Sequence, residues 1–501
     1  MAGKFRDYTM LGITQSLCPE CLAVVPAKII TRGNRVYFRK KCPEHGERED
    51  FVCSDVSYYD QSRFNVPAKL PREYGVLPEK GCPLDCGLCT EHEQHTCIGL
   101  LEITSSCNLA CPMCYASSGP GGKHLSLEEC QAAIDRYVQV EGNPEVMQIS
   151  GGEPTIHPRF YEILDYALAQ PIDYLMINTN GIRLANDREL LDKLASHRDR
   201  LEIYLQFDGF GNEASLALRG EALVETKMRA VERCGEVGLH VNLVCTLQPG
   251  LNDHEMGAII RFCETRPWIT GVSFQPATYS GRHVLPEVLE RRITFPDVIR
   301  GIAEQTEAFQ ERDFIPLPCA HPNCHQMSYA YRQGDKLVPL MRFIDATENL
   351  DLLAGGISFK RPAVKEIIDR YLLRHGCCPG GSCVPGASDA ADSLFPIVEE
   401  TGPPFDLAQV IEQAGPEVAT AAVEFFEKAT RQQLGATDVF RVMITSFLDA
   451  YNFDVRRVMK CCVHHLLPSG HIIPFCAYNV LYREGHVPLP ELNVVEQLSG
   501  N

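Results

Sequence analysis

Three cysteines near the middle of the first half of the chain have a spacing that suits a metal cluster. Cys107, Cys111 and Cys114 follow one another as C-x3-C-x2-C in the segment SSCNLACPMCYA. Iron–sulfur clusters are held by cysteine thiolates, usually four per 4Fe–4S cluster. Three thiolates would leave one iron open to a small molecule, like the open position of a catalytic metal. Tyr115 comes next and could pack its ring beside such a ligand. A redox-inert cluster or zinc site on the same thiols is the alternative.

A second C-x3-C-x2-C segment lies upstream, at Cys82, Cys86 and Cys89. Cys97 follows eight positions later and would supply a fourth thiolate. A fully ligated cluster cannot take a further ligand, but it can carry electrons. We therefore expect an auxiliary 4Fe–4S cluster on these four residues, with structural zinc as the alternative.

The first 60 residues contain two cysteine knuckles about 20 residues apart. Cys18 and Cys21 form the first, Cys42 begins the second in CPEHG, and Cys53 follows. Four thiolates in a ribbon form a tetrahedral site, which suits zinc or a single rubredoxin-like iron. His45 could replace Cys53 as the fourth ligand. So short a segment buries little core, so we expect it to need its metal to fold.

The C-terminal cysteines lie in local pairs that could meet in space. We expect a second auxiliary cluster on Cys319, Cys324, Cys476 and one of Cys461 and Cys462, with Cys461 favoured.

The other cysteines carry weaker signals. Cys377, Cys378 and Cys383 lie in the Gly-rich segment 377–405, which is expected to be a loop or linker, and they form either a separate metal site or exposed thiols. Cys130, Cys234, Cys245 and Cys263 fall within expected helices or strands, where cysteine is usually a small buried hydrophobe.

Alternating strands and helices must position these cysteines. The expected strands are 98–104, 145–150, 173–178, 201–207, 240–246 and 270–275. The expected helices begin after Ser126, whose spacing to Glu129 is that of a capping box, and continue near 158–169, 187–196, 222–237, 252–264 and 294–311. This alternation indicates an α/β fold with parallel strands, either a partial barrel or a doubly wound sheet.

The second, third and fourth expected strands each end in a polar segment that contains glycine. SGGEP ends the second strand, where Gly151 and Gly152 would let backbone approach a ligand and Glu153 could meet an ammonium group. NTNG (178–181) and QFDG (206–209) end the third and fourth strands. Ligand sites of parallel α/β folds gather at the carboxyl ends of strands, so these segments are expected to share one site.

Composition limits the function classes. The 501 residues are 45% hydrophobic and carry a formal charge of −18, which disfavours a general nucleic-acid binder. The N-terminus lacks an apolar signal segment and no long apolar run occurs, so we expect a cytoplasmic protein without a transmembrane helix. The 23 cysteines then favour metal and redox chemistry over disulfides.

Together these motifs resemble those of the radical S-adenosylmethionine (radical SAM) enzymes. Over roughly 98–312 the resemblance implies a partial (β/α)6 barrel whose cluster, on Cys107, Cys111 and Cys114, chelates SAM at the open iron. It implies that a 5′-deoxyadenosyl radical abstracts hydrogen from a substrate carbon. The residues it places near SAM are Gly151, Gly152, Glu153, Asn180, Gln206 and Asp208.

Outside the barrel, the cysteine layout is similar to a branch containing the archaeal tetraether lipid synthases and related proteins described as pterin methylases. It implies several clusters and a substrate channel between the barrel and the C-terminal part. The character of the sequence itself divides the chain into a metal ribbon (1–60), an auxiliary-cluster segment (61–97), the barrel (98–315) and a C-terminal domain with a second auxiliary cluster (316–501).

Three functions remain open: C–C bond formation on a lipid alkyl chain, methyl transfer to a pterin-like heterocycle, and electron transfer without catalysis. We expect a ferredoxin or flavodoxin as reductant, an anoxic setting and possible peripheral contact with a membrane.

Overall fold

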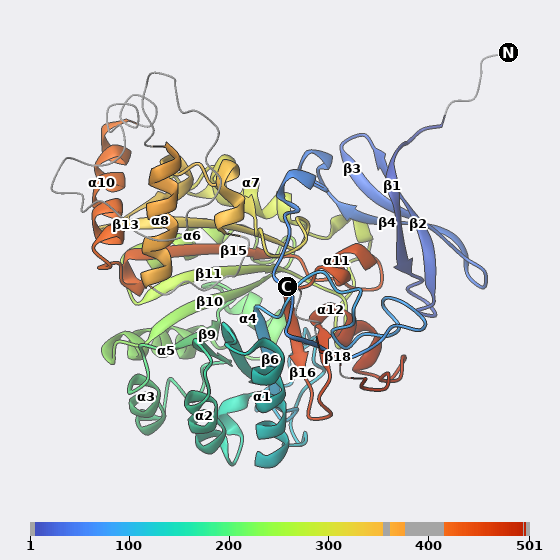
Figure 1. Cartoon of the computed structure of the whole chain (residues 1–501), viewed down its shortest axis with the longest axis horizontal. Helices are drawn as coiled ribbons and strands as arrows, with labels where there is room; N and C mark the ends of the chain where they lie inside the picture. Colours follow the sequence, from blue (N-terminus) through green and yellow to red (C-terminus); the bar gives the residue numbers. More distant parts are fainter. Residues whose placement is uncertain (1–5, 354–360, 376–414, 494, 497–501) are drawn as a thin grey trace, which may run out of the picture.

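The structure is a computed structural model that describes residues 6–353, 361–375, 415–493 and 495–496 (Figure 1). The expected loop at 377–405, with Cys377, Cys378 and Cys383, lies outside the described residues.

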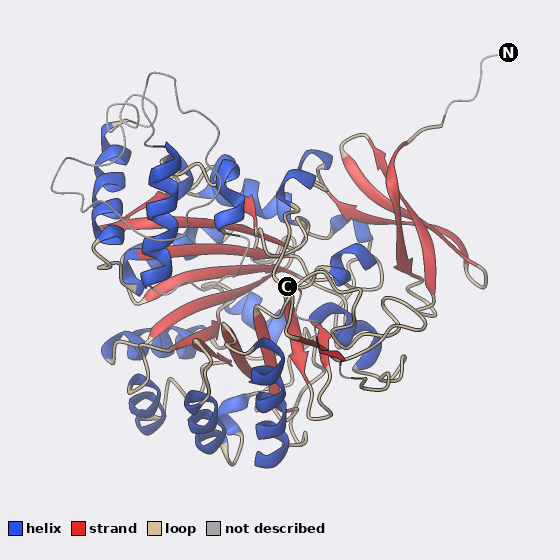
Figure 2. Cartoon of the chain, in the orientation of Figure 1, coloured by secondary structure: helices blue, strands red, loops and turns tan. Residues whose placement is uncertain are grey.

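A twelve-stranded sheet forms the centre of the molecule (Figure 2). Six neighbouring strands run parallel in the order of the sequence. They are β6 (Ile98–Thr104), β7 (Val146–Gly151), β8 (Tyr174–Thr179), β9 (Leu201–Gln206), β10 (His240–Leu247) and β11 (Ile269–Pro276). The six strands expected from the sequence are confirmed, each within a residue or two of its predicted ends.

Helices connect these strands. They are α1 (Leu127–Glu141), α2 (Phe160–Ala169), α3 (Arg188–Ala195), α4 (Asn212–Arg219), α5 (Val224–Glu236), α6 (Met256–Glu264) and α7 (Phe295–Gln305). Ser126 and Glu129 form the expected capping box, since each side chain accepts a hydrogen bond from the other's backbone N–H. The strand–helix units confirm the partial (β/α)6 barrel. The short helix α4, which was not expected, carries a residue important to the site.

The segment after residue 315 extends the same sheet at both edges. Its elements are β12 (Ile315–Pro316), β13 (His325–Gln333), β14 (Lys336–Pro339), α8 (Arg361–His375), α10 (Pro416–Thr430), β15 (Val439–Thr445), α11 (Val455–Met459), β16 (Val463–Leu466), β17 (Ile472–Pro474) and α12 (Phe475–Ala477). β15 pairs parallel with β11, whereas β16 pairs parallel with β6. The expected boundary at 315 therefore does not separate two sheets.

The N-terminal segment is a separate antiparallel sheet at the right of Figure 1, formed by β1 (Thr9–Leu17), β2 (Val24–Arg32), β3 (Arg35–Cys42) and β4 (Gly46–Cys53). A short pairing of β5 (Glu73–Tyr74) with β18 (Val495–Glu496) joins the segments near the two ends of the chain.

Lys40 fixes the N-terminal sheet to the C-terminal part. Its buried ammonium group pairs with Asp50 at 3.0 Å and donates hydrogen bonds to the carbonyls of Leu17, Ala450 and Tyr451. A buried charge is tolerated only when it is paired and hydrogen-bonded in this way.

The main hydrophobic core lies between the barrel strands and their helices, and its buried residues include Leu101, Ile149, Ile177, Leu205 and Leu243. Within the described part of the chain, no helix is long and apolar enough to cross a membrane.

Candidate active site

A cavity of about 1630 Å³ extends along the inside of the barrel. Cys107, Cys111 and Cys114 line one end of it, beside Gly151 and Gly152. These residues come from the loop after β6 and from the end of β7, so the carboxyl ends of the strands form this end of the cavity. The structure therefore brings the cysteine motif and the SGGEP glycines together.

The three cysteines have the surroundings of cluster ligands. Cys107 is 8% exposed, and burial raises the pKa of its thiol to about 11, with the neighbouring Glu153, Cys111 and Cys114 adding to the effect. The backbone N–H of Leu109 donates to the sulfur of Cys107 at 3.4 Å. All three cysteines line the cavity, so a cluster on their thiolates would have an iron open to the cavity.

Two arginines hold the cysteine loop. Arg282 donates to the carbonyls of Cys111, Ser117 and Ser118, and its backbone pairs with that of Cys114. Arg219, from α4, donates to the carbonyl of Met113 at 3.3 Å. These roles could not be predicted from the sequence, because each contact joins residues more than 100 positions apart.

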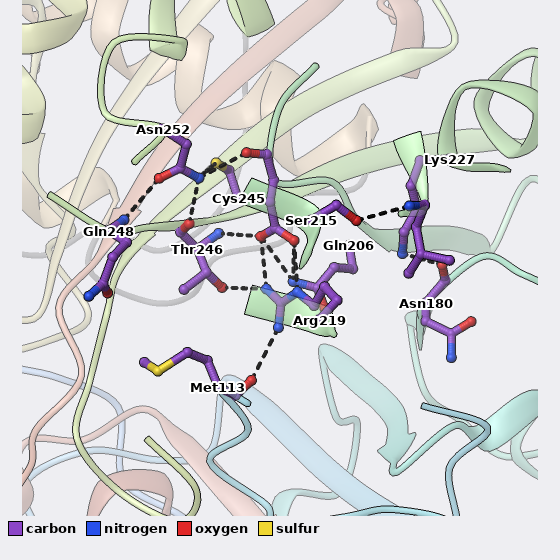
Figure 3. Close-up of polar contacts among 12 residues, drawn as sticks. Met113, Asn180, Gln206, Ser215, Arg219, Lys227, Cys245, Thr246, Gln248 and Asn252 are labelled. Atoms are coloured by element: carbon purple, nitrogen blue, oxygen red, sulfur yellow. Dashed lines mark hydrogen bonds and ion pairs between the residues drawn. The ribbon is translucent and has the colours of Figure 1, made fainter. Parts of the chain in front are cut away.

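Asp208 holds Arg219 and does not reach the cavity. Its carboxylate accepts two hydrogen bonds from the guanidinium group of Arg219, at 2.7 and 2.8 Å, and one from the backbone N–H of Thr246 (Figure 3). Arg219 lines the cavity, whereas Asp208 does not. Asp208 thus positions Arg219, and its expected contact with SAM stays a prediction.

Glu153 is the centre of a buried hydrogen-bond network at the ends of two strands. Its carboxylate is 1% exposed and accepts hydrogen bonds from the hydroxyls of Thr155 and Thr179 and from the backbone N–H groups of Thr155 and Asn180. These bonds occupy both oxygens and tie the end of β7 to the end of β8. Glu153 is not on the cavity wall. These contacts give Glu153 a positioning role, and its expected contact with the SAM amine stays a prediction.

Asn180 and Gln206 line the cavity as expected. The side-chain amide of Asn180 donates to Asn108 in the cysteine loop at 2.7 Å. The backbone carbonyl of Asn180 accepts a hydrogen bond from Lys227 (Figure 3). Burial lowers the pKa of Lys227 to about 8. Gln206 donates to Asp208 at 3.2 Å, so it continues the same polar network.

Tyr115 lines the cavity, and the C-terminal segment holds its ring. Phe475 packs against the ring edge with centroids 5.2 Å apart, and the guanidinium group of Arg483 lies 5.8 Å from the ring centroid. Arg483 is fixed by two hydrogen bonds of 2.8 Å to Glu102 on β6.

The ribbon contains a compact set of four ligands. The ligand atoms of Cys18, Cys21, Cys42 and His45 all lie within 4.8 Å of one another. Three thiolates and one imidazole form a common zinc set. Cys53 is buried at the end of β4 and donates to the carbonyl of Asp55, so the expected fourth ligand is corrected from Cys53 to His45.

Three of the four cysteines expected to hold the first auxiliary cluster lie in the loop at residues 82–89, and their role as ligands stays a prediction. Cys82 and Cys86 are in side-chain contact. Burial raises the pKa of the Cys89 thiol, and the charge of Cys86 adds to the effect. Cys97 instead lies within 4.8 Å of Cys319 and Cys462.

Strand pairing explains this correction. The backbone N–H groups of Cys97 and Ile98 both donate to the carbonyl of Cys462, because β6 pairs with β16. His95 adds a nitrogen 3.5 Å from the sulfur of Cys97.

The expected C-terminal tetrad is also divided. Cys319 belongs with Cys97 and Cys462. Cys461 is half-buried, and burial raises the pKa of its thiol, with the charges of Cys476, Cys462 and Cys324 adding to the effect. Cys462, and not the favoured Cys461, therefore lies in the compact group with Cys97 and Cys319.

Comparison with known proteins agrees with this geometry. Residues 101–263, from β6 to α6, match the radical SAM superfamily. The match contains the cysteine trio, SGGEP, Asn180 and Gln206. The chain therefore belongs to the radical SAM superfamily and is a radical SAM enzyme, with the 4Fe–4S cluster and SAM that this membership implies.

One relative is similar over the whole chain. The 7,8-dihydro-6-hydroxymethylpterin dimethyltransferase of Methanocaldococcus jannaschii is 32% identical over 97% of this chain and 98% of its own length. The mycofactocin maturase MftC of Mycobacterium tuberculosis is 32% identical over 33% of this chain and 44% of its own. Residues 10–54 match the HMPTM N-terminal zinc ribbon domain, in agreement with the ligand set of the ribbon.

Among solved structures, the Streptococcus suis protein SuiB bound to S-adenosylmethionine has a TM-score of 0.33 and 15% identity over 41% of this chain and 46% of its own.

Proposed function

We propose that this radical SAM enzyme removes hydrogen from an unactivated carbon of a long alkyl chain and forms a C–C bond there. The size and lining of the cavity carry the proposal. Beyond the cysteines, apolar side chains continue along it from the barrel strands and from α8 and α10, among them Leu100, Met176, Val244, Ile368 and Phe425. Burying a chain of CH₂ groups against such walls is favourable by about 0.8 kcal/mol per group.

The cluster and SAM, when bound, supply a 5′-deoxyadenosyl radical that can break a strong C–H bond. Joining the terminal methyl carbons of two chains breaks one C–H bond in each and forms one C–C bond. The two hydrogen atoms leave in two molecules of 5′-deoxyadenosine. Two molecules of SAM and two electrons are consumed, and two molecules of methionine are released.

The protein's own residues would position the reactants. Asn180, Gln206 and Arg219 present polar groups at the cysteine end of the cavity, where SAM would lie. Tyr115, held by Phe475 and Arg483, would shield that end.

The remaining thiol groups support an electron-carrying role. We assign one or two auxiliary 4Fe–4S clusters to the groups around Cys86, Cys462 and Cys461, zinc to the ribbon, and a ferredoxin-like or flavodoxin-like reductant to the cytoplasm of an anaerobic cell.

Mass spectrometry of membrane lipids tests the alkyl-chain proposal. A host that expresses the chain should gain lipids whose two chains are joined, and a host that expresses Cys111→Ala should not. Lipids that stay the same in both hosts, although purified protein forms 5′-deoxyadenosine, would refute it.

The second candidate is methyl transfer to a pterin-like heterocycle. It is supported by the name of the whole-length relative and by polar groups on the barrel interior, Gln148, Tyr204 and Gln275, that could hydrogen-bond a heterocycle. Here the products would include S-adenosylhomocysteine and a methylated pterin. Incubation with a reduced pterin, SAM and dithionite, followed by mass spectrometry, separates the two candidates.

A further inference from the structure

The cavity meets solvent at the end of the barrel opposite the cysteines. Six of its lining residues are exposed. They are Asn143, Pro171, Arg198, Asp199, Gln432 and Ala436. At the cysteine end, every lining residue that the structure describes is buried or half-buried.

The six exposed residues share one position in the fold. Asn143 precedes β7, Pro171 precedes β8, Arg198 and Asp199 precede β9, and Gln432 and Ala436 precede β15. They therefore form a rim at the amino ends of the parallel strands. The cysteines and SGGEP follow the carboxyl ends, one strand length away, which is about 20 Å for six residues.

Polarity changes along this path. The rim carries the charges of Arg198 and Asp199 together with the amides of Asn143 and Gln432. Deeper in the barrel, apolar side chains such as those of Leu100, Met176, Val244 and Met327 line the wall, and all four are buried. An amphiphile fits this order, with its polar head hydrated at the rim and its alkyl chain inside.

On this basis we propose that the rim at the amino ends of the strands is the entrance for the substrate, which enters tail first. The inference rests on the proposed alkyl-chain substrate. It assigns the reacting carbon: the end of the chain that is furthest from the head group reaches the cysteine end. It also assigns α8 and α10, beside β13 at the left of Figure 1, as one wall of the entrance, since Tyr371 and Phe425 line the cavity there.

A bulky residue at the rim should obstruct the entrance without reaching the cluster. Ala436→Trp and the double variant Ala436→Trp, Asn143→Trp change exposed positions only. Ala217→Trp is the matched control, because Ala217 is exposed on α4 at the other end of the barrel and does not line the cavity. The probe is a fluorescent long-chain fatty acid, titrated into the anaerobic holoenzyme.

The wild type and Ala217→Trp should bind the probe with equal affinity, and the rim variants should bind it at least tenfold more weakly. SAM affinity and the iron content should be the same in all four proteins. Equal probe binding by the wild type, the control and the rim variants would overturn the entrance and leave the alkyl-chain substrate standing. Failure of the wild type to bind the probe would overturn the alkyl-chain proposal and the entrance with it.

Discussion

Arg219 and Asp208 form a buried, doubly hydrogen-bonded ion pair, with Nε–Oδ2 and Nη2–Oδ1 distances of 2.7 and 2.8 Å. Through this pair, β9 and α4 support the carbonyl of Met113, which lies between two cluster cysteines. Asp208 is thus linked to the cluster loop without touching a ligand.

Asp208→Ala should lower the free energy of unfolding by about 3–5 kcal/mol, because it leaves a buried guanidinium group unpaired. Chemical denaturation under anaerobic conditions measures the loss. The double variant Asp208→Ala, Arg219→Leu should lose less, since neither charge remains. A double variant less stable than Asp208→Ala would contradict this account of the pair.

Cys111→Ala should abolish formation of 5′-deoxyadenosine from SAM and remove the iron of one cluster. Cys234→Ala, which truncates a buried core thiol, should retain both. Iron analysis and chromatography of the reaction products compare the two variants. Persistent 5′-deoxyadenosine from Cys111→Ala would disprove the ligand assignment.

Glu153→Ala should weaken SAM binding about tenfold while the iron content stays constant. The change leaves hydrogen-bond donors of Thr155, Thr179 and Asn180 buried without their acceptor, at about 1–3 kcal/mol for each unsatisfied group. The end of β8, which carries Asn180, would then shift. Thr179→Val removes one of these bonds and should have a smaller effect on SAM affinity in calorimetric titrations. Unchanged SAM affinity in Glu153→Ala would rule out the positioning role.

His45→Ala should lose the ribbon metal, whereas Cys53→Ala should keep it. Metal analysis of the two purified variants shows whether His45 or Cys53 is the fourth ligand. The opposite result would restore the ligand set expected from sequence.

Cys97→Ala should remove the same spectroscopic signal as Cys462→Ala, because the two thiols share one group. Cys86→Ala should remove a different signal. Electron paramagnetic resonance of the dithionite-reduced proteins provides the comparison. If Cys97→Ala and Cys86→Ala lost the same signal and Cys462→Ala kept it, Cys97 would belong with Cys82, Cys86 and Cys89, as the sequence predicted.

The central strands and most of their helices could be predicted because their signals are local. Ser126 and Glu129 specify a helix start within four residues, and the apolar strands end in glycine-bearing turns. The cysteine trio and its neighbour Tyr115 were likewise readable from one short segment.

The remaining features depend on contacts between distant residues. Cys97 meets Cys462 only because β16 pairs with β6, a relationship across more than 360 residues. Glu153 has the residue type of a ligand to an ammonium group, yet its hydrogen bonds to Thr179 and Asn180 turn it inward. Arg219 lies on a helix too short to stand out in the pattern.

The pairing of β15 with β11 and of β16 with β6 also constrains how the molecule is made. Both partners come from the last quarter of the chain, so during synthesis on the ribosome the barrel strands emerge with two unpaired edges. Unpaired edges invite pairing with other chains. The edges of the nascent barrel at β11 and β6 thus remain open to aggregation until residues 439–466 have left the exit tunnel.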